Sequence, residues 1–143
     1  MNQKQNVITL TIQSRLEELN KVELLSEEVG RKMGFSEDQQ DNLSIGVTEA
    51  VGNAIVHGNK KDPSKKVTIR FEMKKDRVTV SVTDEGGGFN PASVSDPLDP
   101  DNLMKESGRG IFILKALMSK VDFTFSPEGT TIHFTMEKKG NSS

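Results

Sequence analysis

The most informative stretch of the chain is TEAVGNAIVHG, residues 48–58. Glu49, Asn53 and His57 recur every four residues in it, which places them on one face of a helix. This face borders the apolar stripe of the same helix, so its polar groups can line a cleft between the helix and a sheet. An asparagine amide oxygen is a ligand suited to Mg²⁺, and a neighbouring carboxylate can deprotonate an attacking hydroxyl. The spacing taken alone favours a solvated helix edge. A functional face is favoured only if neighbouring motifs support it.

A glycine-rich segment, DEGGGF at residues 84–89, follows a predicted strand. Consecutive glycines allow positive φ and a close approach of the backbone to a ligand, which makes Gly86 and Gly88 candidate binding positions. Asp84, at the strand end, can accept a hydrogen bond from an exocyclic amine such as that of adenine. An ordinary loop that needs glycine for its geometry is the alternative.

A second glycine motif, Gly108-Arg109-Gly110, opens a predicted helix. The free N–H groups at a helix N-terminus form a natural phosphate site, and Arg109 can add a charge-assisted contact. A flexible hinge before the helix is the alternative.

Two helices are predicted before the second of these motifs. A capping box of Ser14 and Glu17 opens the first helix, and Gly34 ends it in the left-handed conformation. A second capping box, Ser36 and Gln39, opens the helix that carries residues 48–58.

Alternating apolar residues predict a half-buried strand at residues 8–12 and two hairpins, 67–73 with 78–82 and 121–125 with 132–136. The order β-α-α-β-β-α-β-β predicts an α+β two-layer sandwich, with a mostly antiparallel mixed sheet and helices on one face. We expect a single domain over residues 1–143, with its core at about 7–137. The proline-containing segment 90–107 is long for a loop and is predicted to be a lid.

Composition excludes several classes of protein. The 143 residues carry 19 Lys and Arg against 21 Asp and Glu, so the chain is not a globally basic nucleic-acid binder. It has no cysteine, which excludes disulfides and thiolate chemistry, and two histidines are too few for a histidine-rich metal centre. No apolar run predicts a membrane span or a secretory signal, so we expect a cytoplasmic location. His57 is interpreted as mostly structural, and His133 as solvated on the polar face of a strand.

Taken together, the motifs resemble a known superfamily. The order of motifs resembles that of the GHKL ATPases, whose nucleotide pocket is the Bergerat fold. A helix with E-x-x-x-N comes first, D-x-G-x-G-F follows a hairpin, and a long loop then leads to G-x-G on a helix. Gly129-Thr130 matches the closing glycine-threonine element of these ATPases. The resemblance spans about residues 8–136. Small size and the runs 48–58 and 108–114 are most similar to the RsbW-type anti-sigma-factor serine kinases.

The resemblance implies a role for each motif residue. Glu49 would be the general base, and Asn53 would bind the Mg²⁺ that bridges the phosphates of ATP. Asp84 would read the adenine amino group, supported by Thr130 through an ordered water. The remaining positions are glycines and one arginine: Gly86 and Gly88 would make room for the nucleotide and hinge the lid, the N–H groups of Gly108 to Gly110 would hold the β- and γ-phosphates, and Arg109 would lie near the latter.

The resemblance also implies partners. The phosphate acceptor would be a serine or threonine of an anti-anti-sigma (STAS) protein, and the kinase, as a homodimer, would otherwise sequester a sigma factor. Some members dock the antagonist with an arginine in the first helix, where this chain has Glu23, so Arg15, Lys21 or Arg31 would have to serve.

Two rival functions share the pocket. One is a detached histidine-kinase catalytic domain, which would act on a separate chain. The other is a non-catalytic switch that binds ATP and a partner, although such a switch does not require the base Glu49.

Overall fold

The computed structural model describes residues 6–86 and 109–139, without the side chains of residues 109–112. The predicted order of strands and helices is confirmed. The elements are β1 (Asn6–Gln13), the 3₁₀ turn η1 (Leu16–Glu18), α1 (Leu19–Met33), α2 (Glu37–Asn53), the π turn η2 (Ala54–Gly58), β2 (Lys66–Met73), β3 (Arg77–Thr83), α4 (Arg109–Leu117), β4 (Lys120–Ser126) and β5 (Gly129–Glu137). The predicted lid at 90–107, with Gly88 and Gly108, lies outside the described residues.

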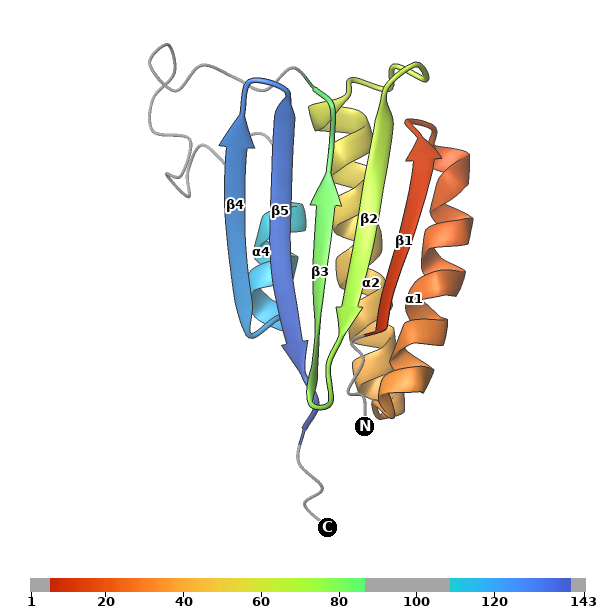
Figure 1. The fold of residues 1–143 in the computed structure, drawn as a ribbon, viewed down its shortest axis with the longest axis vertical. Coiled ribbons are helices and arrows are strands. Elements are labelled where there is room, and N and C mark those ends of the chain that lie inside the picture. Colours follow the sequence, from red (N-terminus) through yellow and green to blue (C-terminus); the bar gives the residue numbers. More distant parts are fainter. Residues whose placement is uncertain (1–5, 87–108, 140–143) are drawn as a thin grey trace.

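The five strands form one sheet in the order β1-β2-β3-β5-β4. Each neighbouring pair is antiparallel, so the described part of the sheet has none of the parallel pairing that a mixed sheet would include. The α-helices of the described residues, α1, α2 and α4, lie on one face of the sheet (Figure 1). The predicted α+β two-layer sandwich is therefore confirmed.

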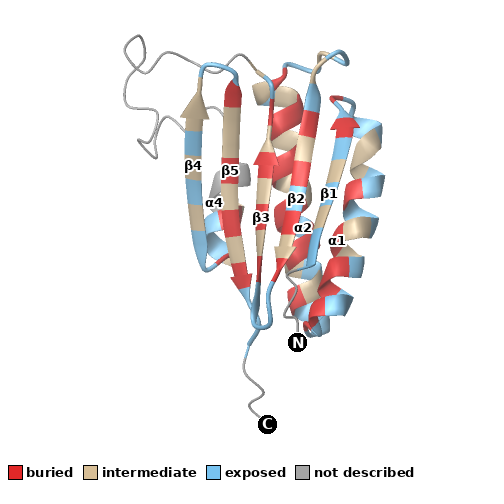
Figure 2. Cartoon of the chain, in the orientation of Figure 1, coloured by how far each residue is buried: buried red, intermediate tan, exposed pale blue. Residues whose placement is uncertain are grey.

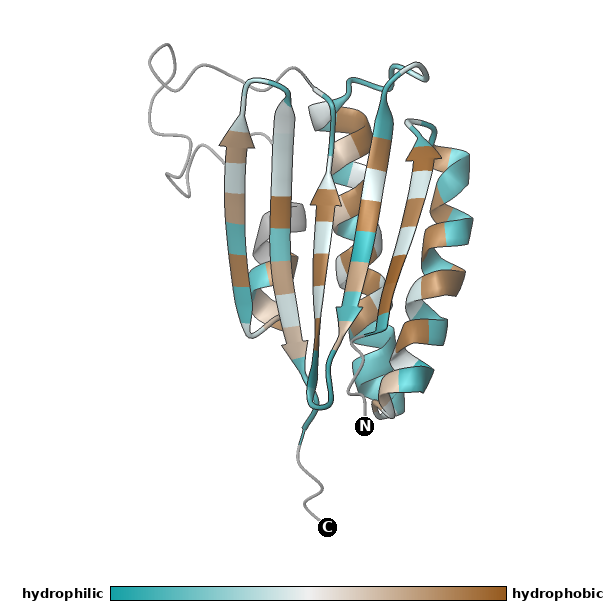
Figure 3. Cartoon of the chain, viewed as in Figure 1, coloured by the Kyte–Doolittle hydropathy of each residue, from teal (hydrophilic) through white to brown (hydrophobic). Residues whose placement is uncertain are grey.

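The core lies between the sheet and the helices. Along β2 and β3 every second residue is buried, which follows from the two-residue period of a strand. The buried and apolar bands coincide along these strands in Figures 2 and 3. The largest fully buried side chains come from both layers: Val67, Ile69, Phe71, Val78 and Phe134 from the sheet, and Val22, Val29, Leu43, Val47, Val51, Ile55 and Leu114 from the helical side. Removing these side chains from water is the main force that holds the layers together.

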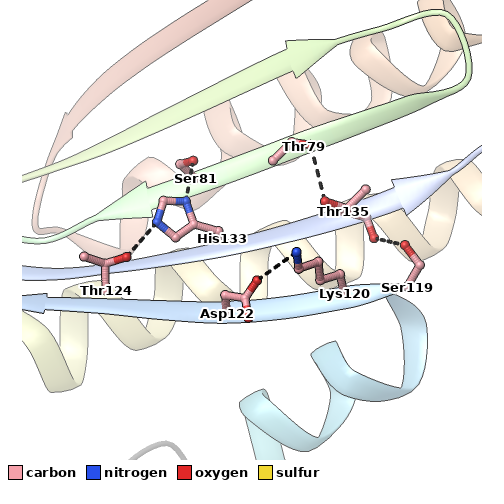
Figure 4. Close-up of polar contacts among 8 residues, drawn as sticks. All are labelled: Thr79, Ser81, Ser119, Lys120, Asp122, Thr124, His133 and Thr135. Atoms are coloured by element: carbon pink, nitrogen blue, oxygen red, sulfur yellow. Dashed lines mark hydrogen bonds and ion pairs between the residues drawn. The ribbon is translucent and has the colours of Figure 1, made fainter. Parts of the chain in front are cut away.

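The outer face of the sheet carries hydroxyl groups that pair across strands (Figure 4). Thr79 and Thr135 lie 3.3 Å apart at their Oγ1 atoms. His133 lies between Ser81, 3.1 Å from its Nδ1, and Thr124, 3.2 Å from its Nε2. His133 is half-buried and bonded through both ring nitrogens, so the prediction that it is simply solvated is wrong.

The helix ends agree only partly with the predicted caps. Gly34 ends α1 with φ 74°, as predicted. Ser36 accepts a hydrogen bond from the Gln39 N–H at 3.2 Å, but the Gln39 side chain donates to the Glu137 carbonyl instead of closing the capping box. The box of Ser14 and Glu17 is wrong, because the helical segment opens at Arg15 without a side-chain cap.

No helix in the described ranges combines the length and the apolar character needed to cross a membrane.

Candidate functional site

Three of the predicted site residues, Asp84, Gly86 and Thr130, lie together at one end of the molecule. There β3 ends, the helical segment of α2 and η2 ends, and the β4–β5 hairpin turns (Figure 1). Asp84 directly follows β3 and is buried, with 8% of its surface exposed. Its backbone N–H donates to the Thr130 carbonyl at 2.9 Å, which continues the pairing of β3 with β5 by one residue.

The Asp84 carboxylate is held on one side only. Its Oδ1 atom accepts hydrogen bonds from the N–H groups of Gly86, at 3.0 Å, and Thr130, at 3.1 Å. Thr130 thus contacts Asp84 directly through its backbone, whereas the predicted water bridge from its side chain remains a prediction. Among the described residues no donor reaches Oδ2, so this oxygen is available to accept a hydrogen bond from a ligand.

Burial sets the electrostatics of this carboxylate. Desolvation raises the pKa of Asp84 above its ordinary value of 3.8. The N–H groups of Gly86 and Thr130, and the positive charge of Lys65, act in the opposite direction but do not cancel the effect. A carboxylate that is kept partly dehydrated gains more from an incoming donor than one exposed to water.

Three glycines enclose Asp84. A Cβ on Gly58 would lie 2.6 Å from Asp84 Cγ, and a Cβ on Gly129 would lie 2.9 Å from the Asp84 carbonyl carbon. Gly86 packs equally closely on Gly58, whose carbonyl carbon would be 2.7 Å from a Cβ at that position. Close backbone packing therefore requires glycine at Gly86, a different reason from the predicted space for a nucleotide.

Glu49 and Asn53 lie one turn apart on α2, and both are half-buried. The Asn53 Nδ2 atom is buried with no hydrogen-bond partner among the described residues. A buried amide left unpaired is uncommon and costs about 1–3 kcal/mol. The Asn53 Nδ2 group is thus a buried donor that an additional hydrogen-bond acceptor would stabilise.

The third member of the predicted helical face behaves differently. From Ala54 the helix widens into a π turn, in which the Asn59 N–H donates to the Ala54 carbonyl at 2.8 Å. His57 lies in this π turn and is exposed, whereas Glu49 and Asn53 are half-buried. That His57 shares their face remains a prediction. Single π turns inside helices occur frequently at functional sites.

The backbone of Arg109 and Gly110 forms the start of α4, as predicted for the glycine motif. α4 packs on α2 where α2 has Gly46, because a Cβ there would be 3.3 Å from Leu114 Cδ2. The contacts of the Arg109 side chain lie outside the described residues.

Sequence patterns missed one central residue. Asn59, interpreted only as part of a helix breaker, is fully buried. Its Oδ1 accepts from the Glu85 N–H at 2.8 Å, and its Nδ2 donates to Ser14 Oγ at 2.8 Å and the Lys66 carbonyl at 3.0 Å. Ser14, predicted to cap a helix, donates instead to the Lys65 carbonyl at 2.7 Å. Periodicity cannot reveal these partners, because they come from segments far apart in the chain.

No group of three or more His, Asp or Glu side chains that could hold a metal occurs in the described ranges. The Asn53 amide is compatible with a bound Mg²⁺, since a single amide oxygen can complete a shell of phosphate oxygens and waters around the ion.

The chain is similar to a known domain family and to several serine-protein kinases. Residues 12–136 match the family model described as histidine kinase-like ATPase domain. The chain is 29% identical over 146 residues to the serine-protein kinase RsbW of Bacillus subtilis (strain 168), covering 98% of this chain and 91% of that protein. It is 31% identical over 113 residues to RsbW of Bacillus licheniformis, covering 75% of this chain and 70% of the relative.

A solved structure shows the same fold. The structure of the RsbU and RsbW domains of a Mycobacterium tuberculosis protein superposes with a TM-score of 0.69 at 17% identity. The superposition covers 94% of this chain and 33% of that longer one. With residues 12–136 matching the family model and a 31% identical relative covered over most of its length, this chain belongs to the histidine kinase-like ATPase domain family, among the RsbW serine-protein kinases.

Proposed function

We propose that this protein is an ATP-dependent serine/threonine protein kinase that acts as an anti-sigma factor. The observation that carries the proposal is the buried Asp84 carboxylate, whose Oδ1 accepts from two backbone N–H groups while no donor of the described residues bonds to Oδ2. Family membership supports the same reading.

At the base end of the site, Asp84 Oδ2 accepts a hydrogen bond from the exocyclic amine of adenine. Thr130 supports this contact through an ordered water, and Gly88 joins Gly86 in forming the hinge of the lid. The enclosing backbone of Gly58 and Gly129 fixes the carboxylate, so the base meets an oriented acceptor rather than a mobile one.

At the phosphate end, Asn53 holds Mg²⁺ through its amide oxygen. The ion supplies charge neutralisation between the phosphates when it is bound. The N–H groups of Gly108 to Gly110 at the start of α4 bind the β- and γ-phosphates, favoured by the helix dipole. Arg109 adds a positive charge near the γ-phosphate.

Glu49 is the general base for phosphoryl transfer. It accepts the proton of the substrate hydroxyl while that oxygen bonds to the γ-phosphorus, and the bond from this phosphorus to the bridging oxygen of ADP breaks. Phosphoryl transfer depends mainly on positioning and charge neutralisation. One carboxylate, one cation and one helix N-terminus are therefore a sufficient set of groups.

The acceptor in this proposal is a serine or threonine of an anti-anti-sigma (STAS) protein. In its unphosphorylated state the antagonist binds the kinase, and phosphorylation releases it, so that a sigma factor is sequestered by a kinase homodimer in the cytoplasm. The relatives' designation as serine-protein kinases supports the choice of acceptor.

The test is an affinity capture from native lysate with the immobilised chain, in Mg-ADP and in Mg-ATP, followed by mapping of phosphorylated residues by mass spectrometry. The same assay is run with Glu49→Gln and with a control, Glu137→Gln, which changes an exposed glutamate at the far end of β5. We expect a STAS protein that is phosphorylated on serine or threonine in Mg-ATP only. Glu49→Gln should bind nucleotide nearly as well but lower transfer by about 100-fold or more, the usual worth of a general base.

Each alternative has its own signature in this assay. Phosphohistidine on a captured protein would identify a histidine kinase domain. Nucleotide-dependent capture without any phosphorylation would identify a non-catalytic switch. Equal transfer by Glu49→Gln and the wild type would show that Glu49 is not the base.

A further inference from the structure

Asn59 occupies a buried junction between segments that are far apart in the chain. Both polar ends of its amide are used, by Glu85 on one side and by Ser14 and Lys66 on the other. Leaving any of these partners unpaired in a fully buried place is costly. The junction therefore ties the end of β1 and the start of β2 to the segment just after β3.

The tie acts next to the carboxylate proposed to read the base. Glu85 directly follows Asp84, and its N–H donates to Asn59 at 2.8 Å. The Glu85 side chain is fixed as well, since its Oε1 accepts from the Lys66 N–H at 2.8 Å. On the opposite side, the backbone of Thr130 holds Asp84 at 2.9 Å and 3.1 Å.

We propose that Asn59 is a positioning residue that orients Asp84 for base recognition and so sets the preference of the site for adenine over guanine nucleotides. The inference rests on the proposed function. Asn59 holds the Glu85 end of the segment while Thr130 holds Asp84 itself, so the peptide between them cannot rotate. Without Asn59, the Glu85 N–H is released, so the neighbouring Gly86 N–H holds Oδ1 less firmly and Oδ2 loses its fixed direction toward the exocyclic group of the base.

The direction of Oδ2 matters because the two purines differ at this position. Adenine presents an amine donor at C6, whereas guanine presents a carbonyl acceptor there, which a fixed carboxylate repels. A carboxylate that is free to turn away discriminates less. Loss of Asn59 should therefore reduce selectivity as well as affinity.

Ser14 offers a matched control. Ser14→Ala removes the same Asn59–Ser14 hydrogen bond from an equally buried place, and it leaves the bond from Glu85 to Asn59 intact. Asn59→Ala removes both of these bonds and also the bond to the Lys66 carbonyl. If Asn59 had a purely structural role, the two variants would show the same ATP-to-GTP affinity ratio when each is measured well below its unfolding temperature.

The test measures fluorescence binding of MANT-ATP and MANT-GTP to the full chain, with amide hydrogen exchange at Glu85. We expect Asn59→Ala to weaken MANT-ATP binding about tenfold, to reduce the ATP-to-GTP affinity ratio and to expose the Glu85 amide, a change of the size of one or two hydrogen bonds. Ser14→Ala should lower the unfolding temperature and keep the wild-type ratio. If Asn59→Ala does not fold, Asn59→Asp takes its place: it keeps an oxygen for Glu85 and should keep the ratio.

The outcomes separate the inference from the function on which it rests. Folded Asn59→Ala with a wild-type ratio, or a ratio lost equally in Ser14→Ala, would overturn the positioning role. Loss of the ratio in folded Asn59→Asp would overturn it too. Failure of the wild-type chain to bind MANT-ATP at all would instead overturn the proposed nucleotide site.

Discussion

A single carboxylate shows how local structure tunes this site. Asp84 is buried, which raises its pKa, while two backbone N–H groups and Lys65 favour its charged form. The two N–H groups bond to Oδ1, and no donor within residues 6–86 or 109–139 bonds to Oδ2. Stability and binding therefore make opposite demands on this residue, because the ligand needs the charge that burial penalises.

Asp84→Asn separates these two demands. Asparagine can still accept from Gly86 and Thr130, but its amide NH₂ cannot accept a hydrogen bond from adenine. We expect MANT-ATP to bind about 10- to 100-fold more weakly, which corresponds to about 1.5–3 kcal/mol for a hydrogen bond to a charged group. Wild-type affinity should also fall as the pH is lowered through the raised pKa of Asp84, and the variant should lack this step.

The stability of the fold depends on pH with the opposite sign to the nucleotide affinity, as far as Asp84 contributes to both. Between the ordinary aspartate value of 3.8 and the raised native value, the folded protein binds a proton that the unfolded chain has released. The contribution of Asp84 to stability is therefore lost as the pH rises through this window. Denaturant unfolding across the window should show Asp84→Asn gaining on the wild type as the pH rises. A constant difference between the two proteins would contradict the assigned pKa shift.

At the scale of the elements, the contact between α2 and α4 joins the two helices of the proposed phosphate end of the site. Gly46 of α2 lets α4 approach, with Leu114 and Met118 against the space where a side chain would be. α4 begins at Arg109, in the motif proposed to bind phosphate. The packing at Gly46 therefore sets where that helix start lies relative to Glu49 and Asn53.

Gly46→Ala tests this contact. The added methyl group would overpack against Met118, and we expect a loss of about 1–3 kcal/mol in the free energy of unfolding. Met118→Ala, which creates a cavity at the same place, should by itself cost about 2–5 kcal/mol. Because the methyl group then has room, the double variant should cost less than the sum of the two by about 0.5–3 kcal/mol. Strictly additive values from denaturant titrations would show that the two positions do not share this space.

At the scale of the whole molecule, the site is an assembly of segments from distant parts of the sequence. The end of β3, the π turn after α2, the β4–β5 hairpin and the start of β2 meet around residues 84–86. A ligand that contacts several of them binds the folded chain and not the unfolded one, so it should stabilise the entire fold.

Thermal unfolding with Mg-ATP tests this linkage. At a nucleotide concentration 100 times the Kd, the folded state should gain about 2.7 kcal/mol, which raises the Tm by several degrees for a chain of this size. Asp84→Asn, at the same nucleotide concentration, should show a much smaller rise. An unchanged Tm of the wild type at high Mg-ATP would contradict the nucleotide site.

Much of the fold could be predicted because its determinants are local. The buried faces follow from patterns along single elements. Every second residue is apolar in β2 and β3, and apolar stripes run along α1, with Val22 and Val29, and along α2, with Val47. Gly34 was recognisable as a cap because a left-handed helix end favours glycine whatever surrounds it. The Ser14 cap failed for the opposite reason: its hydroxyl found a stronger partner in Lys65, 51 residues away.

The sequence by itself determined the class of fold and which residues are candidates for chemistry, since these depend on spacing along one element. Only the tertiary structure decided that Gly58 and Gly129 enclose Asp84 and that Asn59 holds its neighbour. It also decided that the helix widens into a π turn at Ala54–Gly58. These features arise where separate segments compete for the same buried hydrogen-bonding groups, most of which find a partner when water is excluded.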